Sequence, residues 1–269
     1  MRISTISAPL KRSARTMAAL LLAGCSSITQ SEASFQKYGA VNFIGKRASA
    51  TQGRAAATVV FFESLSLQVP NSSAQQSDQC VFAPVDTVQQ VARGDRQAGT
   101  TVGITIGGAT RQLPYSSTDL RYATAANEPI VYNVGDVAQV SVPGDGNNFP
   151  AIAGSVKLAE PIELGPVAIP AAGAGLTVNW NGTNDPTAAV ILQVKYANPA
   201  TASFANEQVY CALKDDGNVV VPAGLLTQFL ASSAPRRSLT LVRWRTNLVG
   251  TTAGNLHLTS SIDTTFVFP

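Results

Sequence analysis

The stretch YCALKDDGNVVVPAGLLTQFL (residues 210–230) contains the local signals that decide the fold class. Its first residues form a β-rich run that enters an Asp216-Gly217 turn and returns as the apolar run Val219, Val220 and Val221, since Asp and Gly suit tight turns. Proline has no backbone N–H for a strand ladder and suits the first turn of a helix, so Pro222 ends the second run. We expect a short helix with one apolar side to follow. That side consists of Leu225, Leu226, Phe229 and Leu230.

More strands are expected on both sides of this stretch in the C-terminal part of the chain, because short β-rich runs alternate there with turn residues. The predicted strands are 176–181, 188–196, 208–213, 218–222, 238–246 and a final pair within 255–268. This number of strands in roughly 100 residues is typical of an immunoglobulin-like sandwich. We therefore expect such a domain over residues 176–269, with Trp180 in its core.

The same pattern extends toward the N-terminus. The predicted strands there are 55–69, 79–83, 100–106, 109–113, 120–124, 136–142 and 153–158. They predict a first β-sandwich over residues 35–158. Residues 159–175 are rich in proline and glycine, and we interpret them as a linker or as an irregular edge strand of the second domain.

The first 25 residues have a different character. Residues 1–16 carry four basic side chains and no acidic one, and they run into an apolar stretch, 17–24. That stretch is far shorter than the roughly 20 residues that a membrane span needs. A positive segment followed by a short apolar one and small residues is typical of an export signal. The sequence LAGC, which ends at Cys25, resembles the lipobox of bacterial lipoproteins.

This resemblance implies that residues 1–24 are removed as a signal peptide and that acylated Cys25 becomes the first residue of the mature chain. The attached acyl chains would anchor the protein in membrane lipid. Residues 25–34 are small and polar and predict a flexible tether. We expect the protein on the extracytoplasmic side of the cell envelope, and Ser26 after the cysteine favours the outer membrane or cell surface over the inner membrane.

Removal of the predicted signal changes the charge of the chain. The full chain has 19 basic and 16 acidic side chains, of which the signal holds four basic ones, leaving 15 against 16. A nearly neutral mature protein gives no electrostatic reason to expect a nucleic-acid partner.

The opening stretch also resembles a group of predicted bacterial lipoproteins of unknown function. That group has a Cys-bearing strand, an Asp-Gly turn and a V-P-x-x-L-L corner near the end of the chain, which correspond here to Cys211 and residues 221–226. Its earlier strands resemble AGTTVGITI (98–106) and VNW (178–180). The resemblance is spread over residues 80–230 and implies a two-sandwich envelope lipoprotein, with no known activity.

Cys80 and Cys211 are the two cysteines outside the predicted lipobox. An even pair in an oxidising compartment favours a disulfide. The sequence leaves two alternatives open, namely a bond that links the two domains or two separately buried thiols. Two distant cysteines and a single histidine give no ligand cluster, so we expect no metal site of the zinc type.

Few residues suit catalysis. His257 is the only histidine, and its strand pattern predicts that it faces solvent while its leucine neighbours face the core. No G-x-S-x-G motif accompanies it. Asp215 and Asp216 lie on a turn, where we expect both side chains to point into water.

The loops GDGNN (144–148) and NWNGTND (179–185) offer oxygen ligands for calcium but lack a closing acidic residue. No Gly-rich phosphate loop is present, so we expect no nucleotide cofactor. Because the sequence shows no catalytic cluster, we expect no enzyme and no cofactor of another kind.

Aromatic side chains offer another kind of site. Trp244 lies between Arg243 and Arg245, and strand alternation puts it on the face opposite to both. In one interpretation Trp244 is in the core and both arginines are in solvent. In the other, Trp244 faces outward as a stacking platform for a sugar or a partner. The tyrosines considered for the same role are Tyr115, Tyr122 and Tyr132.

These observations favour a non-enzymatic, lipid-anchored envelope protein with a structural or accessory role. We expect it to bind another envelope protein through a sheet edge or face. The alternative is a surface module that binds glycans or acts as an adhesin. A hydrolase that uses His257 is the third hypothesis.

Overall fold

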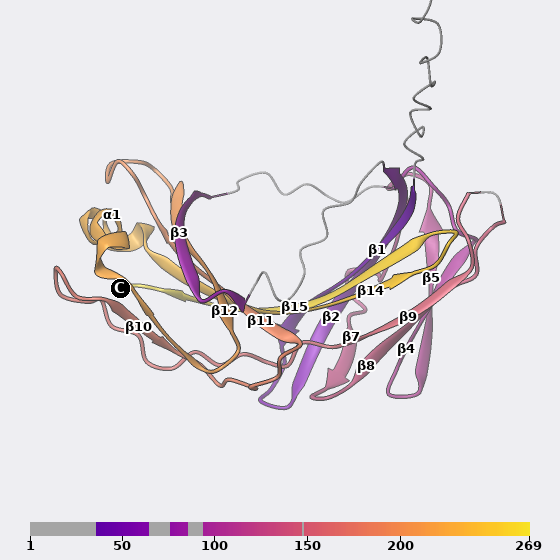
Figure 1. The fold of residues 1–269 in the computed structure, drawn as a ribbon, viewed down its shortest axis with the longest axis horizontal. Helices are drawn as coiled ribbons and strands as arrows, with labels where there is room; N and C mark the ends of the chain where they lie inside the picture. The colour runs from indigo at the N-terminus through magenta and orange to yellow at the C-terminus, as the bar shows by residue number, and fades with distance from the viewer. Residues whose placement is uncertain (1–35, 65–75, 86–93, 147) are drawn as a thin grey trace, which may run out of the picture. The chain divides into compact units, whose positions relative to one another are not determined.

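The computed structural model describes residues 36–64, 76–85, 94–146 and 148–269. The predicted signal, 1–24, and the tether with Cys25, 25–34, lie outside the described residues. Residues Phe35–Pro269 form one compact unit that is nearly all β, which confirms the predicted all-β class (Figure 1).

The strands and helices agree with most of the predicted segments. The strands are β1 Gln36–Arg47, β2 Gln52–Ser64, β3 Gln79–Pro84, β4 Thr101–Ile106, β5 Ala109–Ser116, β6 Arg121–Ala123, β7 Ile130–Asn133, β8 Val137–Val142, β9 Ile152–Lys157, β10 Leu176–Asn179, β11 Ala188–Tyr196, β12 Glu207–Lys214, β13 Asn218–Val221, β14 Ser238–Gly250 and β15 Asn255–Val267. The helices are two short 3-10 helices, η2 Ala223–Leu225 and η3 Ala234–Arg236, and the α-helix α1 Thr227–Ala231.

Three predicted details differ from the structure. The final pair of strands within 255–268 is wrong, because this segment is the single long strand β15. The predicted strand 55–69 begins earlier, at Gln52, and its last residues, 65–69, lie outside the described residues. The strands β1 and β7 were not predicted at all.

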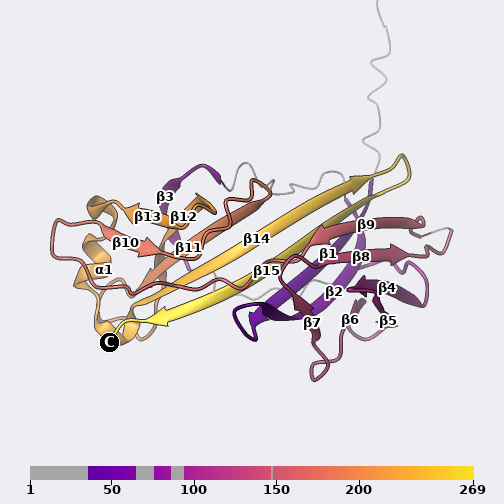
Figure 2. The ribbon, with the colours of Figure 1, turned by 90° about the horizontal axis from the view of Figure 1, so that it is seen from below.

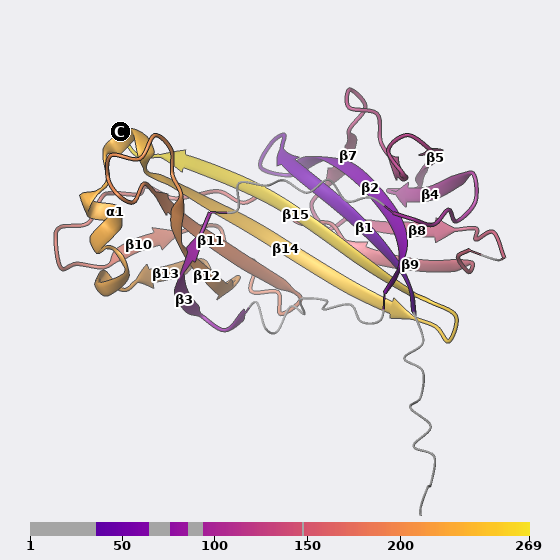
Figure 3. The same cartoon turned by 90° about the horizontal axis from the view of Figure 1, so that it is seen from above.

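One large sheet contains 13 of the strands. Its order is β3-β12-β11-β14-β15-β1-β2-β6-β5-β4-β8-β9, with β7 paired to β2 beside this path. The long strands β14 and β15 lie side by side along their whole length, as Figure 3 shows. β1 pairs with β15 in parallel, so the first described strand lies in the middle of the sheet beside the last one.

The opening stretch of the sequence forms the predicted strand, turn, strand and helix, but its two strands do not pair with each other. β12 pairs with β11 and β3, whereas β13 pairs with β10 in a separate two-stranded sheet. The turn at Gly217 therefore carries the chain from one sheet to the other. The predicted apolar side of the helix is confirmed, since Leu226 and Phe229 are fully buried.

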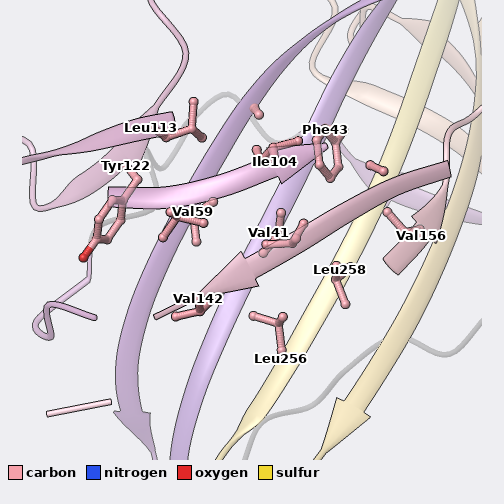
Figure 4. Packing of buried hydrophobic residues seen from close by; sticks show 14 of the residues in the cluster. Val41, Phe43, Val59, Ile104, Leu113, Tyr122, Val142, Val156, Leu256 and Leu258 are labelled. Atoms are coloured by element: carbon pink, nitrogen blue, oxygen red, sulfur yellow. The ribbon is translucent and has the colours of Figure 1, made fainter. Parts of the chain in front are cut away.

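The first hydrophobic core lies among β1, β2, β4, β8, β9 and the N-terminal half of β15. Figure 4 shows Val41 and Val59 of β1 and β2 near Ile104 and Val142 of β4 and β8, with Leu258 of β15 beside them. Each side chain of this size contributes about 1.5–3 kcal/mol when it is removed from water. The core therefore holds the strands of this half together.

The second core lies between the small β10–β13 sheet and the face formed by β11, β12 and β14. Figure 2 shows β10, β11, β12 and β13 in the half of the molecule that contains α1. Leu176, Val178 and Val221 of the small sheet pack in one cluster with Leu192 and Leu241 of the large sheet. Trp180 is 7% exposed and belongs to this cluster, which confirms its predicted core position.

The strand pairing crosses the predicted domain boundary. β3, from the predicted first domain, pairs with β12 of the second, and Leu256 and Leu258 from β15 lie in the first core. The division into residues 35–158 and 176–269 stays a prediction, and the large sheet is continuous across it.

Candidate functional site

A layer of charged side chains separates the two cores along the inner face of β14 and β15. Leu256 and Leu258 lie in the first core and Leu241 in the second, and Arg243 and Arg245 lie along the strands between them. The two arginines are 0% and 1% exposed. We call the ion-paired group to which they belong the buried charge layer. It consists of Arg243, Arg245, Lys157, Glu160, Asp185 and Asp215.

Arg243 and Asp215 form the more deeply buried pair of the layer. The Nε and Nη2 atoms of Arg243 donate to the two carboxylate oxygens of Asp215 at 2.8 and 3.0 Å. The remaining N–H groups of Arg243 bond the backbone carbonyls of Glu160, Pro161 and Asn181. Both charges are thus fully hydrogen-bonded, which a buried ion pair requires.

Asp215 accepts further hydrogen bonds from Trp180 Nε1 at 2.9 Å and from Thr183 Oγ1 at 2.5 Å. Burial alone would raise the pKa of this carboxyl. The hydrogen bonds and charge of Arg243, with smaller contributions from Thr183 and Trp180, outweigh burial and lower that pKa. Asp215 is therefore a buried anion held in place by β14 and by residues 180–183.

Arg245 forms the second pair of the layer. Its Nε and Nη2 atoms donate to the Glu160 carboxylate at 2.8–3.0 Å, and its Nη1 donates to Asp185 Oδ2 at 2.9 Å. Lys157 Nζ lies 3.1 Å from Glu160 Oε1 and 3.0 Å from Asp185 Oδ2. The charges of the three acidic and three basic side chains cancel. The layer also joins β14 to residues 159–161 and to the 180–187 loop.

This geometry overturns two expectations. Asp215 does not point into water, because it is 3% exposed, although Asp216 is exposed as predicted. Arg243 and Arg245 are not in solvent either. The predicted alternation of Trp244 against the arginines holds, but the buried face is the arginine face. The reason is that carboxylates from distant segments reach these arginines and remove the cost of burying them.

Trp244 and His257 lie on the opposite face of the sheet, and both are half-buried. Trp244 is in register with Ala189 and Ser261. His257 lies on the face opposite the core as predicted, but it is only partly exposed, and its Nε2 lies 2.6 Å from Thr246 Oγ1. Burial lowers the pKa of His257, which favours the neutral ring. Leu256 and Leu258 face the core as predicted.

The oxygens of both candidate calcium loops are used by the protein itself. In the 179–185 loop, Asn181 Oδ1 accepts from the backbone N–H of Glu163, and Asp185 accepts from Lys157 and Arg245. In the 144–148 loop, Asp145 Oδ1 accepts from the backbone N–H groups of Asn148 and Phe149. Within the described ranges, no cluster of three or more His, Cys, Asp or Glu side chains is arranged to hold a metal ion.

Cys80 and Cys211 are joined by a disulfide. They are opposite each other in the ladder between β3 and β12. The bond therefore ties the end strand of the large sheet, β3, to its neighbour. Val81 and Phe82, which follow Cys80, are more than half exposed at 54% and 55%.

Two of the three tyrosines proposed as stacking platforms are buried in the first core instead. The hydroxyl of Tyr122 donates to the carbonyl of Gly99, and that of Tyr132 donates to the carbonyl of Ala159. Burial raises the pKa of both phenols, that of Tyr132 to about 12. Tyr115 is the exception, since it is half-buried and lines a surface groove.

This groove lies between β2 and β5, and we call it the β2–β5 groove. It has a volume of about 1300 Å³ and is lined by Ala56 and Thr58 of β2, by residues 111–116 of β5, and by the segment 124–129 with Val131. Most small-molecule clefts have about 300–1,000 Å³. The groove therefore has room for a segment of polypeptide.

The groove exists because the sheet is incomplete between β5 and β2. β6 pairs with both neighbours but is only three residues long, and it meets β5 only at Tyr115 and Ser116. Beyond Ala123 the chain leaves the sheet and returns as β7, which pairs only with β2 among the described strands. Among the described strands, residues 109–114 of β5 thus have a partner on the β4 side alone.

Three arginines line the groove, namely Arg54, Arg111 and Arg121. Arg111 donates to the carbonyl of Glu128 at 3.3 Å. Within the described part of the chain, none of the three forms an ion pair, and Arg121 Nε is buried without a hydrogen-bond partner. Asp119 and Glu128 also line the groove, which leaves it with one excess positive charge.

The sequence pattern does not predict this groove. The gap depends on how long β6 remains paired and on the position of β7, which was not predicted, and tertiary contacts set both. The arginines gave no local signal, because they lie on three different strands or strand ends.

No described helix is long and apolar enough to cross a membrane. No known protein-family model matches this sequence, and comparison with curated proteins gives no match either.

Proposed function

We propose that this protein is a lipid-anchored component of a bacterial cell envelope with a structural or accessory role, and that it binds another envelope protein through the β2–β5 groove. The proposal is non-enzymatic. The observation that carries it is the unpaired edge of β5 beside a groove of about 1300 Å³, because exposed strand edges are sites at which other chains add a strand.

The anchor rests on the sequence pattern of the N-terminus. A basic segment, a short apolar run and LAGC ending at Cys25 support a cleaved signal and lipidation of Cys25. Two or more acyl chains are enough for stable membrane attachment. Ser26 supports the outer membrane or the cell surface as its location. The tether 25–34 would then allow the compact unit to reach a partner at some distance from the lipid.

Two sandwich modules, one around each core, remain our proposal for the domain organisation, with an immunoglobulin-like arrangement as its finer form. The two hydrophobic clusters support the presence of two modules. The continuous sheet implies that they do not separate freely, so a partner bound at the groove would meet a single rigid surface.

The first test is chemical crosslinking in intact cells, followed by affinity capture of the tagged protein and mass spectrometry. We expect one stoichiometric partner that is lost when Cys25→Ser removes the anchor. If no partner reproducibly crosslinks to the anchored protein, the proposed function is wrong.

Glycan binding is the second candidate, and the position of Tyr115 supports it. A half-buried aromatic ring beside arginines in an open groove suits a sugar face and its hydroxyls. Trp244, half-buried on another face, is the other candidate platform. A glycan array together with tryptophan and tyrosine fluorescence tests both, and we expect Tyr115→Ala to abolish any binding in the groove. Unchanged signals with cell-wall sugars would remove this candidate.

A further inference from the structure

We propose that the partner contributes an extended, acidic segment that lies in the β2–β5 groove, adds a strand to the free edge of β5 and pairs its carboxylates with Arg54, Arg111 and Arg121. This inference rests on the proposed function, because it specifies the chemistry of the partner at the same site.

The backbone of β5 offers hydrogen bonds to such a strand. The N–H of Tyr115 donates to the carbonyl of Thr100 at 3.0 Å, so Tyr115 directs its backbone groups toward the β4 side. In an antiparallel pair, successive residues direct these groups alternately toward the partner strand and away from it. Arg111 and Leu113 therefore face β4 with Tyr115, and Thr110 and Gln112 direct their N–H and C=O groups into the gap.

The opposite side of the gap also has a free edge. The N–H of Val134 donates to the carbonyl of Thr51 at 2.9 Å, and the same alternation directs the backbone of Val131 away from β2. Val131 and Arg111 line a smaller pocket of about 130 Å³ at this point. The side chain of Val131 is 53% exposed and gives an apolar contact for a bound strand.

The excess positive charge of the groove favours a partner segment with acidic side chains. A carboxylate bonds a guanidinium through two parallel N–H···O bonds, which gives geometric specificity. Arg54 and Arg121 have no side-chain hydrogen bond in the described structure, and Arg121 Nε is buried without any acceptor. A ligand carboxylate would pair with the Nη groups of Arg54 and Arg121, which form no hydrogen bond among the described residues.

A short synthetic peptide tests the inference directly. The probe is the acetylated and amidated peptide Thr-Glu-Val-Glu-Val-Glu-Val-Thr, close to the usual strand length of about 5–6 residues. Its controls are the same peptide with lysine in place of glutamate and the same peptide with alternate backbone nitrogens methylated. Binding to the full chain carrying Cys25→Ser is measured by isothermal titration calorimetry and by amide hydrogen exchange.

We expect the acidic peptide to bind and both control peptides to bind at least about tenfold more weakly. Exchange of the Thr110 and Gln112 amide hydrogens should slow on binding, because strand addition would protect both. Binding of the lysine peptide with equal affinity, or no slowing at these two amides, would overturn the inference.

Separate variants test the strand edge and the charge. Gln112→Pro removes one outward N–H and should abolish binding; proline is tolerated at strand edges, and Pro114 already occupies the equivalent position two residues later. Arg121→Glu should weaken binding by about tenfold or more. Arg236→Glu, at an exposed site on η3, is the matched control and should have no effect.

The same variants distinguish this inference from the proposed function. If the partner still crosslinks in cells to the Gln112→Pro and Arg121→Glu variants, the acidic strand in the groove is wrong but the accessory role stands. If no partner crosslinks to the unchanged protein, the accessory role itself fails, whatever the peptide does.

Discussion

Arginine side chains occur in two contrasting environments in this protein. Arg243 and Arg245 are buried between two hydrophobic cores, and both form ion pairs with carboxylates. Arg54, Arg111 and Arg121 line an open groove and form no ion pair among the described residues. The same guanidinium group therefore has a structural role in one region and is available for recognition in the other.

The difference comes from where the carboxylates lie. Removing a charged group from water costs several kcal/mol unless a partner of opposite charge and hydrogen bonds replace the water. Glu160 and Asp215 supply both in the buried charge layer, and their segments are thereby fixed to β14. The groove arginines keep part of their contact with water, so the fold does not depend on pairing them.

The largest expected effect is the loss of a buried partner. Arg243→Met should lower the free energy of unfolding by about 3–5 kcal/mol, because it leaves the Asp215 carboxylate buried without its counter-ion. Urea unfolding followed by tryptophan fluorescence measures this loss. Arg236→Met, at an exposed site, is the control and should change the free energy by less than about 0.5 kcal/mol. A loss below about 1 kcal/mol for Arg243→Met would show that the layer does not hold the fold together.

A smaller effect is expected at the other end of the layer. Glu160→Gln should cost about 1.5–3 kcal/mol, since it removes the charge that Arg245 pairs with but leaves one acceptor oxygen and the Asp185 contact. The matched control is Glu163→Gln, whose side chain is 42% exposed and pairs with Arg47 at the surface. Equal losses at Glu160 and Glu163 would contradict the contrast between buried and exposed pairs.

The sequence predicted the strands better than it predicted their partners. Alternating runs such as 188–196 correspond directly to β11, because a half-buried strand leaves a period of two in the sequence. β1 was missed because glycines and lysines interrupt its apolar residues. Yet Gly39 is required by packing, since a Cβ there would lie 2.7 Å from Leu256 Cδ1. A glycine that usually indicates a turn is here a site of close strand packing.

The buried charge layer was hidden for a different reason. Arg243 pairs with a carboxylate 28 residues away, and Arg245 with one 85 residues away. No local period relates such residues, so strand alternation correctly separated Trp244 from its two neighbours but did not show which face is buried. Charged residues are usually exposed unless paired, and the sequence alone does not reveal the pairing.

Acid should destabilise the layer. The pKa of Asp215 is lowered in the folded state, and that of Asp185 is lowered as well, so both contribute stability above the ordinary carboxyl pKa of 3.8. This contribution is lost as the pH falls through the folded-state pKa values. The free energy of unfolding should therefore decrease progressively below about pH 4, and Asp215→Asn should make the decrease shallower. An identical pH dependence in Asp215→Asn and in the control Asp216→Asn would contradict this prediction.

The smallest change in the free energy of unfolding is expected when an arginine of the groove is replaced. Comparison of this change with that of Arg243→Met is the most informative test of the two environments. Arg121→Met should leave the free energy of unfolding within about 0.5 kcal/mol of the unchanged protein or raise it slightly, because it removes a buried Nε that has no partner. Urea unfolding beside Arg243→Met measures the difference under one set of conditions. A loss comparable with that of Arg243→Met would mean that Arg121 supports the fold, and its open donor could then no longer be assigned to a ligand. A neutral result leaves recognition as the role that explains why a charged side chain with an unsatisfied donor lies in this groove.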